Sequence, residues 1–347
     1  MSRVCPIIII IIIACLSGCV GAGENKPTEN PVLPEQGDVT IYVTTSSRSQ
    51  DFKKQAVDFS SEQSVATIML HPEQRYQTMD GFGAAITGSA AYNLLQMTPE
   101  NRTKFLKETF SHTEGMGYSY VRIAIGCSDF SLSEYTCWDN PEADFALTSE
   151  ENDYVIPVLK EILAINPSLK ILASPWTCPI WMKDKPSWTG GRLKREYYGD
   201  YAGYFVQWIQ AFQAQGIKIT SVTPQNEPLN DGNSASLHMD WQEQRDFVNL
   251  YLAPALKPLG VKIYLLDHNY DLAYYPLNIY NAGVDDEVVA GAAFHDYVGY
   301  FDQLNYVHDR APEKELIFTE TSLGEWNNGR NLSARLSRRW RGSPTFG

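Results

Sequence analysis

The sequence has no surplus of positive charge and no motif that would hold a nucleotide phosphate. Its 347 residues include 28 Lys and Arg against 41 Asp and Glu, which gives a formal net charge of −13. A chain of this charge repels polyphosphates, so we expect no nucleic-acid partner. No glycine-rich phosphate-binding loop is present either. Aromatic residues make up 12% of the chain, and their faces suit a neutral sugar polymer, although most of them are expected in the core.

Cysteine is too scarce in the body of the chain for a disulfide framework. Three of the six cysteines lie in the first 19 residues, and the other three are Cys127, Cys137 and Cys178. An odd number of thiols cannot all be paired. Cys127 and Cys137 can form one bridge across the loop between them, or both can be free buried thiols. No Cys or His spacing resembles a zinc site, and the sequence implies neither a metal nor a cofactor.

The N-terminus has the pattern of a secretory leader. Arg3 precedes the apolar run Ile7 to Ile13, which is too short to span a bilayer as a permanent helix. The following Leu-Ser-Gly-Cys resembles the bacterial lipoprotein box, so residues 1–19 are predicted to be a lipoprotein signal with Cys19 as the lipidation site. Residues 20–38 are predicted to be a flexible tether. The predicted location is the bacterial cell envelope, anchored by lipid, and the alternative is a cleaved signal with release into the periplasm or medium.

From residue 39 onward, short strands alternate with helices in the manner of a parallel (β/α) barrel. Residues 39–74 contain two predicted strands, 39–45 and 64–70, which we assign to a small side β domain. Residues 75–330 are predicted to form the barrel. Its predicted strands cover 81–86, 118–125, 170–174, 217–223, 262–266, 288–294 and 316–319, and predicted helices at 98–110, 154–165, 201–215 and 241–256 separate the first five of them.

The pattern predicts seven barrel strands, after which it fails. Beyond Asn331 the chain is rich in arginine, and it stops without an eighth strand. An open barrel would leave the edges of its first and seventh strands unpaired. We therefore expect residues 331–347 to be an aberrant or truncated tail, and the sequence to be a fragment.

Two glutamates follow predicted barrel strands. Pro224 ends the fourth strand, and Gln225-Asn226-Glu227 come next, while Glu320 ends the seventh. The carboxyl ends of the strands form the face on which parallel barrels display catalytic groups. A single glutamate after a short strand is usually a solvated loop residue. Two of them on that face match the acid and the nucleophile or base that glycoside hydrolysis requires.

These motifs resemble glycoside hydrolase family 30, the family of glucosylceramidases and β-1,6-glucanases. The resemblance covers about residues 75 to 330, and its motifs stand in the family's order. They are Gly81-Phe82-Gly83, Arg122 with Ser128-Asp129-Phe130-Ser131, Ser174-Pro175-Trp176-Thr177, Gln225-Asn226-Glu227-Pro228 and Thr319-Glu320-Thr321. The resemblance implies a (β/α)8 TIM barrel, here lacking its eighth strand, with remnant strands of a side β-sandwich.

The resemblance also implies a retaining mechanism, with Glu320 as the nucleophile and Glu227 as the acid/base. Retaining enzymes hold the two carboxyl groups roughly 5–5.5 Å apart. The ionised nucleophile is expected to raise the pKa of Glu227, which would keep it a usable acid near neutral pH.

Five further residues are implied to bind the substrate or to support the carboxylates. Asn226 is expected to bind the 2-hydroxyl of the sugar, and Trp176 to line the subsite with its aromatic face. Arg122 is expected to hold the nucleophile ionised, a role compatible with a structural ion pair. Tyr297 is expected near the nucleophile. His295 is either a supporting hydrogen-bond donor or a satisfied core histidine.

The sequence departs from the family at two places. Thr87-Gly88 stand where the glucosylceramidases have an acidic sugar-binding residue, and the eighth strand with its subsite tryptophan is absent. We therefore do not predict the first of these sugar contacts, and we do not assign Asp80 in its place.

The predicted substrate is a cell-surface polysaccharide, with β-1,6-glucan as the first choice. The loop from Asp129 to Tyr135 and the lipoprotein leader favour this choice. A glucosylceramidase-type β-glucosidase acting on a glycolipid is the first alternative, because one glucose subsite serves both substrates. Xylan-directed members would need an arginine for a uronic acid, which we cannot place. An alternative of another class is an inactive, glycan-binding surface lipoprotein.

Overall fold

The computed structural model describes residues 37–45, 47–61, 69 and 71–322. These residues fall into two units, divided in sequence between Thr78 and Met79. The signal segment, Cys19, most of the tether and the tail at 331–347 lie outside the described residues, so the predictions for them stay predictions. No helix in the described ranges is long and apolar enough to cross a membrane.

The first unit contains one antiparallel pair of strands. β1 (Val39–Val43) pairs with β2 (Lys53–Val57), with Val39 opposite Val57. The stacked rings of Tyr42 and Phe52 lie 5.0 Å apart. The strand predicted at 39–45 is thus confirmed. The strand predicted at 64–70 falls almost entirely outside the described residues, and β2 escaped prediction because its sequence, Lys-Lys-Gln-Ala-Val, has no apolar alternation.

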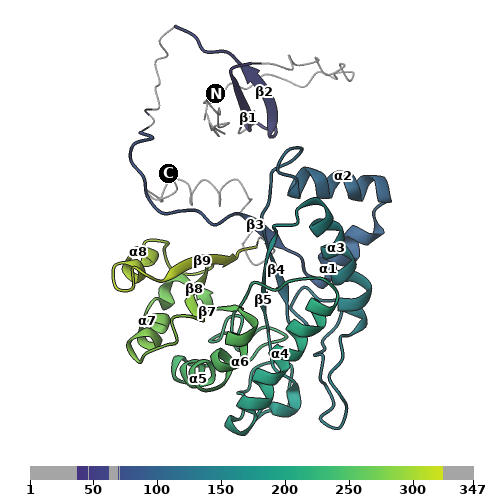
Figure 1. Cartoon of the computed structure of the whole chain (residues 1–347), viewed down its shortest axis with the longest axis vertical. Coiled ribbons are helices and arrows are strands. Elements are labelled where there is room, and N and C mark those ends of the chain that lie inside the picture. The colour runs from purple at the N-terminus through teal and green to yellow at the C-terminus, as the bar shows by residue number, and fades with distance from the viewer. Residues whose placement is uncertain (1–36, 46, 62–68, 70, 323–347) are drawn as a thin grey trace. The chain divides into compact units, whose positions relative to one another are not determined.

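The second unit is a curled sheet of seven parallel strands, arranged in sequence order (Figure 1). Within the described residues no eighth strand pairs with either edge. Each predicted barrel strand overlaps an observed one, although the observed fourth strand contains only two residues. The strands are β3 (Gly83–Ala85), β4 (Tyr120–Ala124), β5 (Lys170–Ser174), β6 (Ser221–Val222), β7 (Lys262–Asn269), β8 (Val289–His295) and β9 (Glu315–Glu320).

Helices lie around the outside of this sheet (Figure 1). Thr98 caps the predicted helix at 98–110 by accepting a hydrogen bond from the backbone N–H of Asn101, with Pro99 in its first turn. The helix predicted at 241–256 is interrupted by a π-helical stretch at 248–252. The helices are α1 (Gly88–Gln96), α2 (Pro99–Phe110), α3 (Ile156–Ile165), α4 (Tyr198–Ala214), α5 (Trp241–Phe247), α6 (Ala253–Leu256), α7 (Tyr274–Asn281) and α8 (Gln303–His308).

The main core lies between the sheet and its helices. α4 contributes the largest share, and its aromatic residues Tyr201, Tyr204, Phe205, Trp208 and Phe212 are fully buried. Such rings remove large apolar areas from water, so their burial in α4 contributes strongly to the stability of the core. The three described cysteines are free and buried in this core, which decides between the two alternatives left open for Cys127 and Cys137.

A smaller cluster lies on the other face of the sheet. It joins Leu172, Tyr264 and Ala293 from β5, β7 and β8. Residues two apart on a strand share a face, so Leu172 lies on the same face as Ser174, the last residue of β5. Ser174 accepts a hydrogen bond from Arg122 of β4. The inner face of the sheet therefore changes from apolar to polar toward the carboxyl ends of its strands.

Candidate active site

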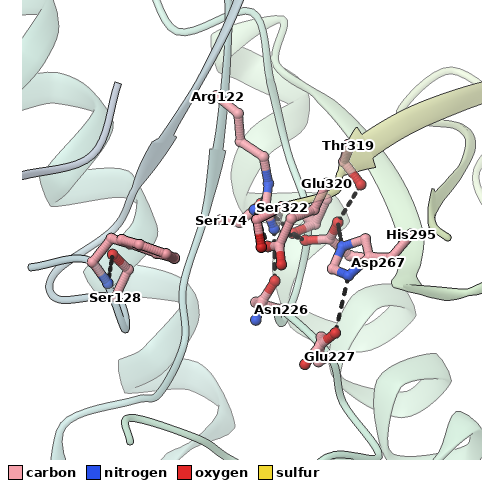
Figure 2. Close-up of polar contacts among 12 residues, drawn as sticks. Arg122, Ser128, Ser174, Asn226, Glu227, Asp267, His295, Thr319, Glu320 and Ser322 are labelled. Atoms are coloured by element: carbon pink, nitrogen blue, oxygen red, sulfur yellow. Dashed lines mark hydrogen bonds and ion pairs between the residues drawn. The ribbon is translucent and has the colours of Figure 1, made fainter. Parts of the chain in front are cut away.

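Arg122 is the centre of a buried polar cluster at the carboxyl ends of the strands (Figure 2). Its Nη1 donates to Oε2 of Glu320 at 2.7 Å. Its Nη2 donates to Oδ1 of Asn226 and to Oδ2 of Asp267, each at 2.7 Å, and its Nε donates to Oγ of Ser174 at 3.2 Å. One guanidinium thus joins β4, β5, β7, β9 and the segment after β6. The expected contact between Arg122 and Glu320 is confirmed.

Asp267 is the second centre of the cluster, and no motif in the sequence assigns it a role. Its Oδ2 also accepts a hydrogen bond from Thr223 at 2.7 Å. Its Oδ1 accepts from Thr319 at 2.6 Å and from Nε2 of His295 at 3.0 Å. Burial alone would raise the pKa of this carboxyl group, but Arg122 and His295 outweigh burial and hold the pKa far below its usual range. Asp267 is therefore a permanent negative charge.

A bulge in β7 places Asp267 in the cluster. The strand was predicted to end at Leu266, but it continues to Asn269, with a register shift between Leu266 and His268. Leu266 and Asp267 both have left-handed backbone conformations, with φ of 69° and 64°. The Leu266 N–H donates to the side chain of Gln244 instead of to a strand neighbour. Such bulges redirect side chains, and here the strained backbone turns a carboxylate toward Arg122.

Glu227 is buried five residues after the end of β6. Its φ of 43° is left-handed, and its N–H donates to the backbone oxygen of Asp267 at 2.9 Å. The side chain accepts hydrogen bonds at both oxygens. Oε1 lies 3.2 Å from Nδ1 of His295, and Oε2 accepts from Asn230 at 2.6 Å and from Asn233 at 3.3 Å. Backbone and side chain are therefore both fixed.

His295 sets the charge of Glu227. The imidazole is fully buried between Glu227 and Asp267. Burial would lower its pKa, but hydrogen bonds to the two carboxylates outweigh burial and raise the pKa to about 9. Burial would likewise raise the pKa of Glu227, but contact with the imidazolium lowers it below the ordinary value. The expectation that the nucleophile raises the pKa of Glu227 is therefore wrong for this arrangement, because the cation is in direct contact. His295 is a supporting donor rather than an isolated core residue.

A second histidine lies beside Glu227. Nδ1 of His268, on β7, lies 3.8 Å from Oε1 of Glu227. Burial lowers the pKa of His268 to about 4, more than the carboxylates raise it, so this imidazole is neutral near pH 7. No motif in the sequence assigns His268 a role, although it lies near the end of β7.

Glu320 is the last residue of β9, and its side chain is 22% exposed. Besides the bond from Arg122, it accepts one at Oε1 from the Tyr297 hydroxyl at 2.9 Å. Burial and the negative charge of Glu320 raise the pKa of Tyr297, so the phenol stays protonated and remains a donor. The expected position of Tyr297 beside Glu320 is confirmed.

Trp176 is buried against the same cluster. The Arg122 guanidinium carbon lies 4.7 Å from the centre of the indole ring, a cation–π distance. The backbone oxygen of Trp176 accepts a hydrogen bond from Gln225 at 2.7 Å. One face of the ring therefore supports Arg122, which the sequence did not predict. Contact between Trp176 and a sugar stays a prediction.

A third carboxylate, Asp129, borders the site from the loop after β4. This loop is folded by the Ser128 N–H, which donates to Oγ of Ser131 at 2.9 Å (Figure 2). Although Asp129 as a whole residue is exposed, burial of its carboxyl group and then the charges of Glu320 and Glu227 raise its pKa to about 6. Asp129 was part of a recognised motif. Its electrostatic interaction with both glutamates follows only from its place in the folded loop.

Lys183 ties together the segments that follow β5 and β6. Its buried ammonium group donates to Oγ1 of Thr177 at 3.1 Å and to the backbone oxygens of Ser187 and Ser236 at 2.6 and 2.8 Å. Burial lowers its pKa. Because Thr177 follows Trp176, this ammonium fixes the walls beside the indole ring.

Comparison with known proteins identifies relatives over most of the chain. The profile of the glycosyl hydrolase family 30 TIM-barrel domain matches residues 79–338. A solved endo-β1,6-glucanase, BT3312, is 57% identical with a TM-score of 0.82, covering 87% of this chain and 70% of that one. Putative glucosylceramidase 4 of Caenorhabditis elegans is 29% identical over 83% of this chain. The endo-1,6-β-D-glucanase BGN16.3 of Trichoderma harzianum is 31% identical over 76%.

The last two relatives are longer proteins than this chain. The matched region spans 60% of the glucosylceramidase and 59% of the fungal glucanase. Residues 79–338 include the whole buried cluster around Arg122 and both glutamates.

Proposed function

The chain belongs to glycosyl hydrolase family 30, and on that premise we propose that it is a retaining β-glycoside hydrolase, with Glu320 as nucleophile and Glu227 as acid/base. One observation carries the proposal. A continuous series of buried contacts, Glu320–Arg122–Asp267–His295–Glu227, links the two carboxylates at the carboxyl ends of the strands. This face is where parallel barrels carry out catalysis.

The surroundings of Glu320 suit a nucleophile. Arg122 and the Tyr297 hydroxyl both donate to its carboxylate, which fixes the direction of the attacking oxygens. A carboxylate oxygen of Glu320 attacks the anomeric carbon while the bond to the leaving oxygen breaks and that oxygen takes a proton from Glu227. Water then gives a proton to Glu227 and attacks the glycosyl ester, which restores both residues.

Glu227 obtains its acidic proton from a shared pair. The proton lies on Nδ1 of His295, 3.2 Å from Oε1 of Glu227. Transfer across this contact converts a carboxylate and an imidazolium into a neutral acid and a neutral imidazole. Exclusion of water by a bound sugar favours that neutral form, because desolvation penalises separated charges. The two groups titrate as one unit, and the low pKa of Glu227 is compatible with acid catalysis.

Asn226 is oriented for a sugar contact. Its Oδ1 accepts a hydrogen bond from Arg122 at 2.7 Å, which fixes the amide and leaves its NH₂ group as the donor for a ligand. A donor beside the nucleophile suits the 2-hydroxyl, whose hydrogen bonds strengthen in the oxocarbenium-like transition state.

The proposed substrate is β-1,6-glucan, and the proposed cleavage is at internal linkages of this polymer. Two similar proteins carry that activity in their names, one of them a solved structure that is 57% identical. Hydrolysis of glucosylceramide is the second candidate, supported by the resemblance to a glucosylceramidase at 29% identity. A shared glucose subsite would serve both substrates.

Incubation with pustulan, a β-1,6-glucan, tests the activity, and Glu320→Gln is the matched inactive control. We expect gentio-oligosaccharides from the unchanged chain only. Release of glucose from glucosylceramide, with no products from pustulan, would move the assignment to the second candidate. Calorimetric binding of pustulan without any hydrolysis by the folded protein would favour a glycan-binding lipoprotein instead.

We also propose that the chain is lipid-anchored at the bacterial cell envelope through Cys19. The apolar run and the Leu-Ser-Gly-Cys motif support this assignment. The protein should incorporate labelled palmitate, and the variant Cys19→Ala should not incorporate it. An unlabelled protein recovered from the medium would contradict the anchor.

A further inference from the structure

Two imidazoles and one carboxylate converge at one point beside the proposed acid/base. Nδ1 of His295 lies 3.2 Å from Oε1 of Glu227, and Nδ1 of His268 lies 3.8 Å from the same oxygen. The potential ligand atoms of the three residues all lie within 4.8 Å of one another, and all three residues are buried. The ligand atoms come from β7, β8 and the segment after β6, so their convergence has no signature in sequence spacing.

His268 contributes a polar atom that the protein itself does not satisfy. Among the described residues its Nδ1 has no hydrogen-bond partner, and the residue is only 7% exposed. A buried polar atom without a partner is costly, and native proteins rarely leave one unless a ligand or water completes it. This nitrogen faces the Glu227 carboxylate at a distance too long for a hydrogen bond.

The three donors suit a particular class of cation. Imidazole nitrogens with one carboxylate oxygen form the ligand set of Zn²⁺, whereas Mg²⁺ and Ca²⁺ prefer oxygen alone. Ligands about 2.1 Å from a tetrahedral ion lie about 3.4 Å from one another. The 3.2 and 3.8 Å separations at Oε1 of Glu227 bracket that value.

The residues behind the donors also match a metal centre. Nε2 of His295 lies 3.0 Å from Oδ1 of Asp267 and donates to it. A metal-binding histidine typically donates its second nitrogen to a carboxylate, which orients the ring. Once His295 has given up its proton to make room for the ion, Glu227, Glu320 and Asp267 supply three negative charges against the single cation of Arg122, so a divalent ion restores the local balance of charge.

We infer that Glu227, His268 and His295 form a binding site for Zn²⁺ and that occupancy inhibits the chain. The ion takes the place of the proton on Nδ1 of His295, and that proton leaves to solvent. The ion also binds the carboxylate oxygen that would carry the acidic proton, so protonation of the leaving oxygen stops. Inhibition rests on the proposed function, whereas binding of the ion does not.

Titration of the purified full chain with Co²⁺ tests the site, because tetrahedral Co²⁺ has visible absorption bands. We expect one equivalent to bind with these bands and to be displaced by Zn²⁺. His268→Ala should weaken binding by at least about tenfold, since loss of even an outer partner costs 10–100-fold. Glu227→Gln should do the same, which keeps the test valid if one variant fails to fold.

His238→Ala is the matched control. His238 also lies beside a carboxylate, with Nδ1 3.0 Å from Asp231, but among the described residues it belongs to no group of potential metal ligands. Binding should be unchanged in this variant. Unchanged Co²⁺ binding in both folded site variants would overturn the inference, and so would a failure of the unchanged chain to bind Co²⁺. The appearance of thiolate charge-transfer bands in the near ultraviolet would also overturn it, because such bands would show that cysteine binds the ion.

An activity assay with Zn²⁺ separates this inference from the proposed function. Zn²⁺ should lower kcat for pustulan hydrolysis, a chelator should restore it, and any residual hydrolysis by His268→Ala should resist the ion. Hydrolysis unaffected by Zn²⁺ would overturn the inhibitory site and leave the proposed function intact. Absence of hydrolysis in all conditions, with Co²⁺ still bound by the three residues, would overturn the proposed function alone.

Discussion

The two proposed catalytic carboxylates differ in the cation that each one contacts. Glu320 lies at the end of a regular strand, is partly exposed, and accepts hydrogen bonds from Arg122 and Tyr297. Glu227 is buried on a strained, left-handed backbone and accepts from His295 and two asparagines. Arginine does not lose its proton in proteins, whereas histidine titrates in an accessible range.

This difference corresponds to the two roles. A nucleophile must remain ionised through the first step, and a permanent cation secures that state. An acid/base must gain and lose one proton in each cycle, and a titratable neighbour can store it. Asp267 links the two environments, because it accepts hydrogen bonds from both Arg122 and His295.

Removal of each carboxylate should give the largest effect and should distinguish the two roles. Glu320→Ala should lose roughly 10⁴-fold or more of kcat, and Glu227→Ala roughly 10²–10⁴-fold. Azide should restore turnover of an activated β-glucoside in both variants. It should form the α-glucosyl azide in Glu320→Ala, by direct attack from the vacated side, and the β-glucosyl azide in Glu227→Ala, by attack on the glycosyl ester.

The anomeric form of the azide product is read by proton NMR. The reverse assignment of products would exchange the roles of the two residues. Failure of azide rescue in both folded variants would contradict the mechanism altogether.

Arg122→Met should have the next largest effect, because it removes the fixed cation. The buried carboxylate of Asp267 and the partly exposed carboxylate of Glu320 would lose their partner. Removal of one member of a buried ion pair costs about 3–5 kcal/mol of unfolding free energy. Urea unfolding measures the loss, and Arg102→Met is the control, because its more exposed pair with Glu161 should contribute at most about 1 kcal/mol. Equal losses of unfolding free energy in the two variants would show that Arg122 contributes no more to stability than a surface ion pair does.

His295→Gln should shift the pH dependence of kcat/KM. In the unchanged chain the Glu227–His295 pair keeps its proton up to the His295 pKa of about 9, so activity should fall above that pH. Without the imidazole, the carboxyl group alone must hold the proton. A carboxyl pKa starts from about 4.3, and burial raises it only partly toward 9, so the alkaline limb should move down by more than about one pH unit.

The same profile for His238→Gln should match that of the unchanged chain, since His238 lies outside the buried cluster. An alkaline limb that stays in place in His295→Gln would show that the proton is not held by the pair.

Tyr297→Phe should have the smallest effect. It removes one 2.9 Å hydrogen bond to Glu320 and leaves the bond from Arg122 in place. Loss of one hydrogen bond to a charged group should lower kcat roughly tenfold, with little change in the alkaline limb. A loss as large as that of Glu320→Ala would mean that Tyr297, rather than Arg122, controls the nucleophile.

The parts of the site that lie next to their own strands could be predicted from the sequence. Glu320 and the segment around Glu227 follow apolar β-branched runs, and a parallel barrel brings such ends to one face. The predicted bounds of β5, 170–174, match the observed ones, because an apolar run marks a strand buried on both faces. The cap of α2 is equally local, since Thr98 and Pro99 lie beside each other.

The parts set by tertiary contacts could not be predicted. The bulge that turns Asp267 toward Arg122 depends on Gln244, more than twenty residues earlier in the chain. The partners of His268 and His295 come from separate segments, so the low pKa of Glu227 had no local signal. Helices α1, α7 and α8 were missed, and both α7 and α8 are short, at eight and six residues.

Trapping of the glycosyl ester tests the central assignment most directly. A 2-deoxy-2-fluoro-β-glucosyl fluoride destabilises the oxocarbenium-like transition states, and its good leaving group lets the ester form faster than water removes it. Digestion after Lys and Arg should release residues 315–330 with the mass of one fluoroglucosyl group, and fragmentation should place that group on Glu320. A label on Glu227, or unlabelled protein that still hydrolyses the glucan, would contradict the assignment of Glu320 as nucleophile.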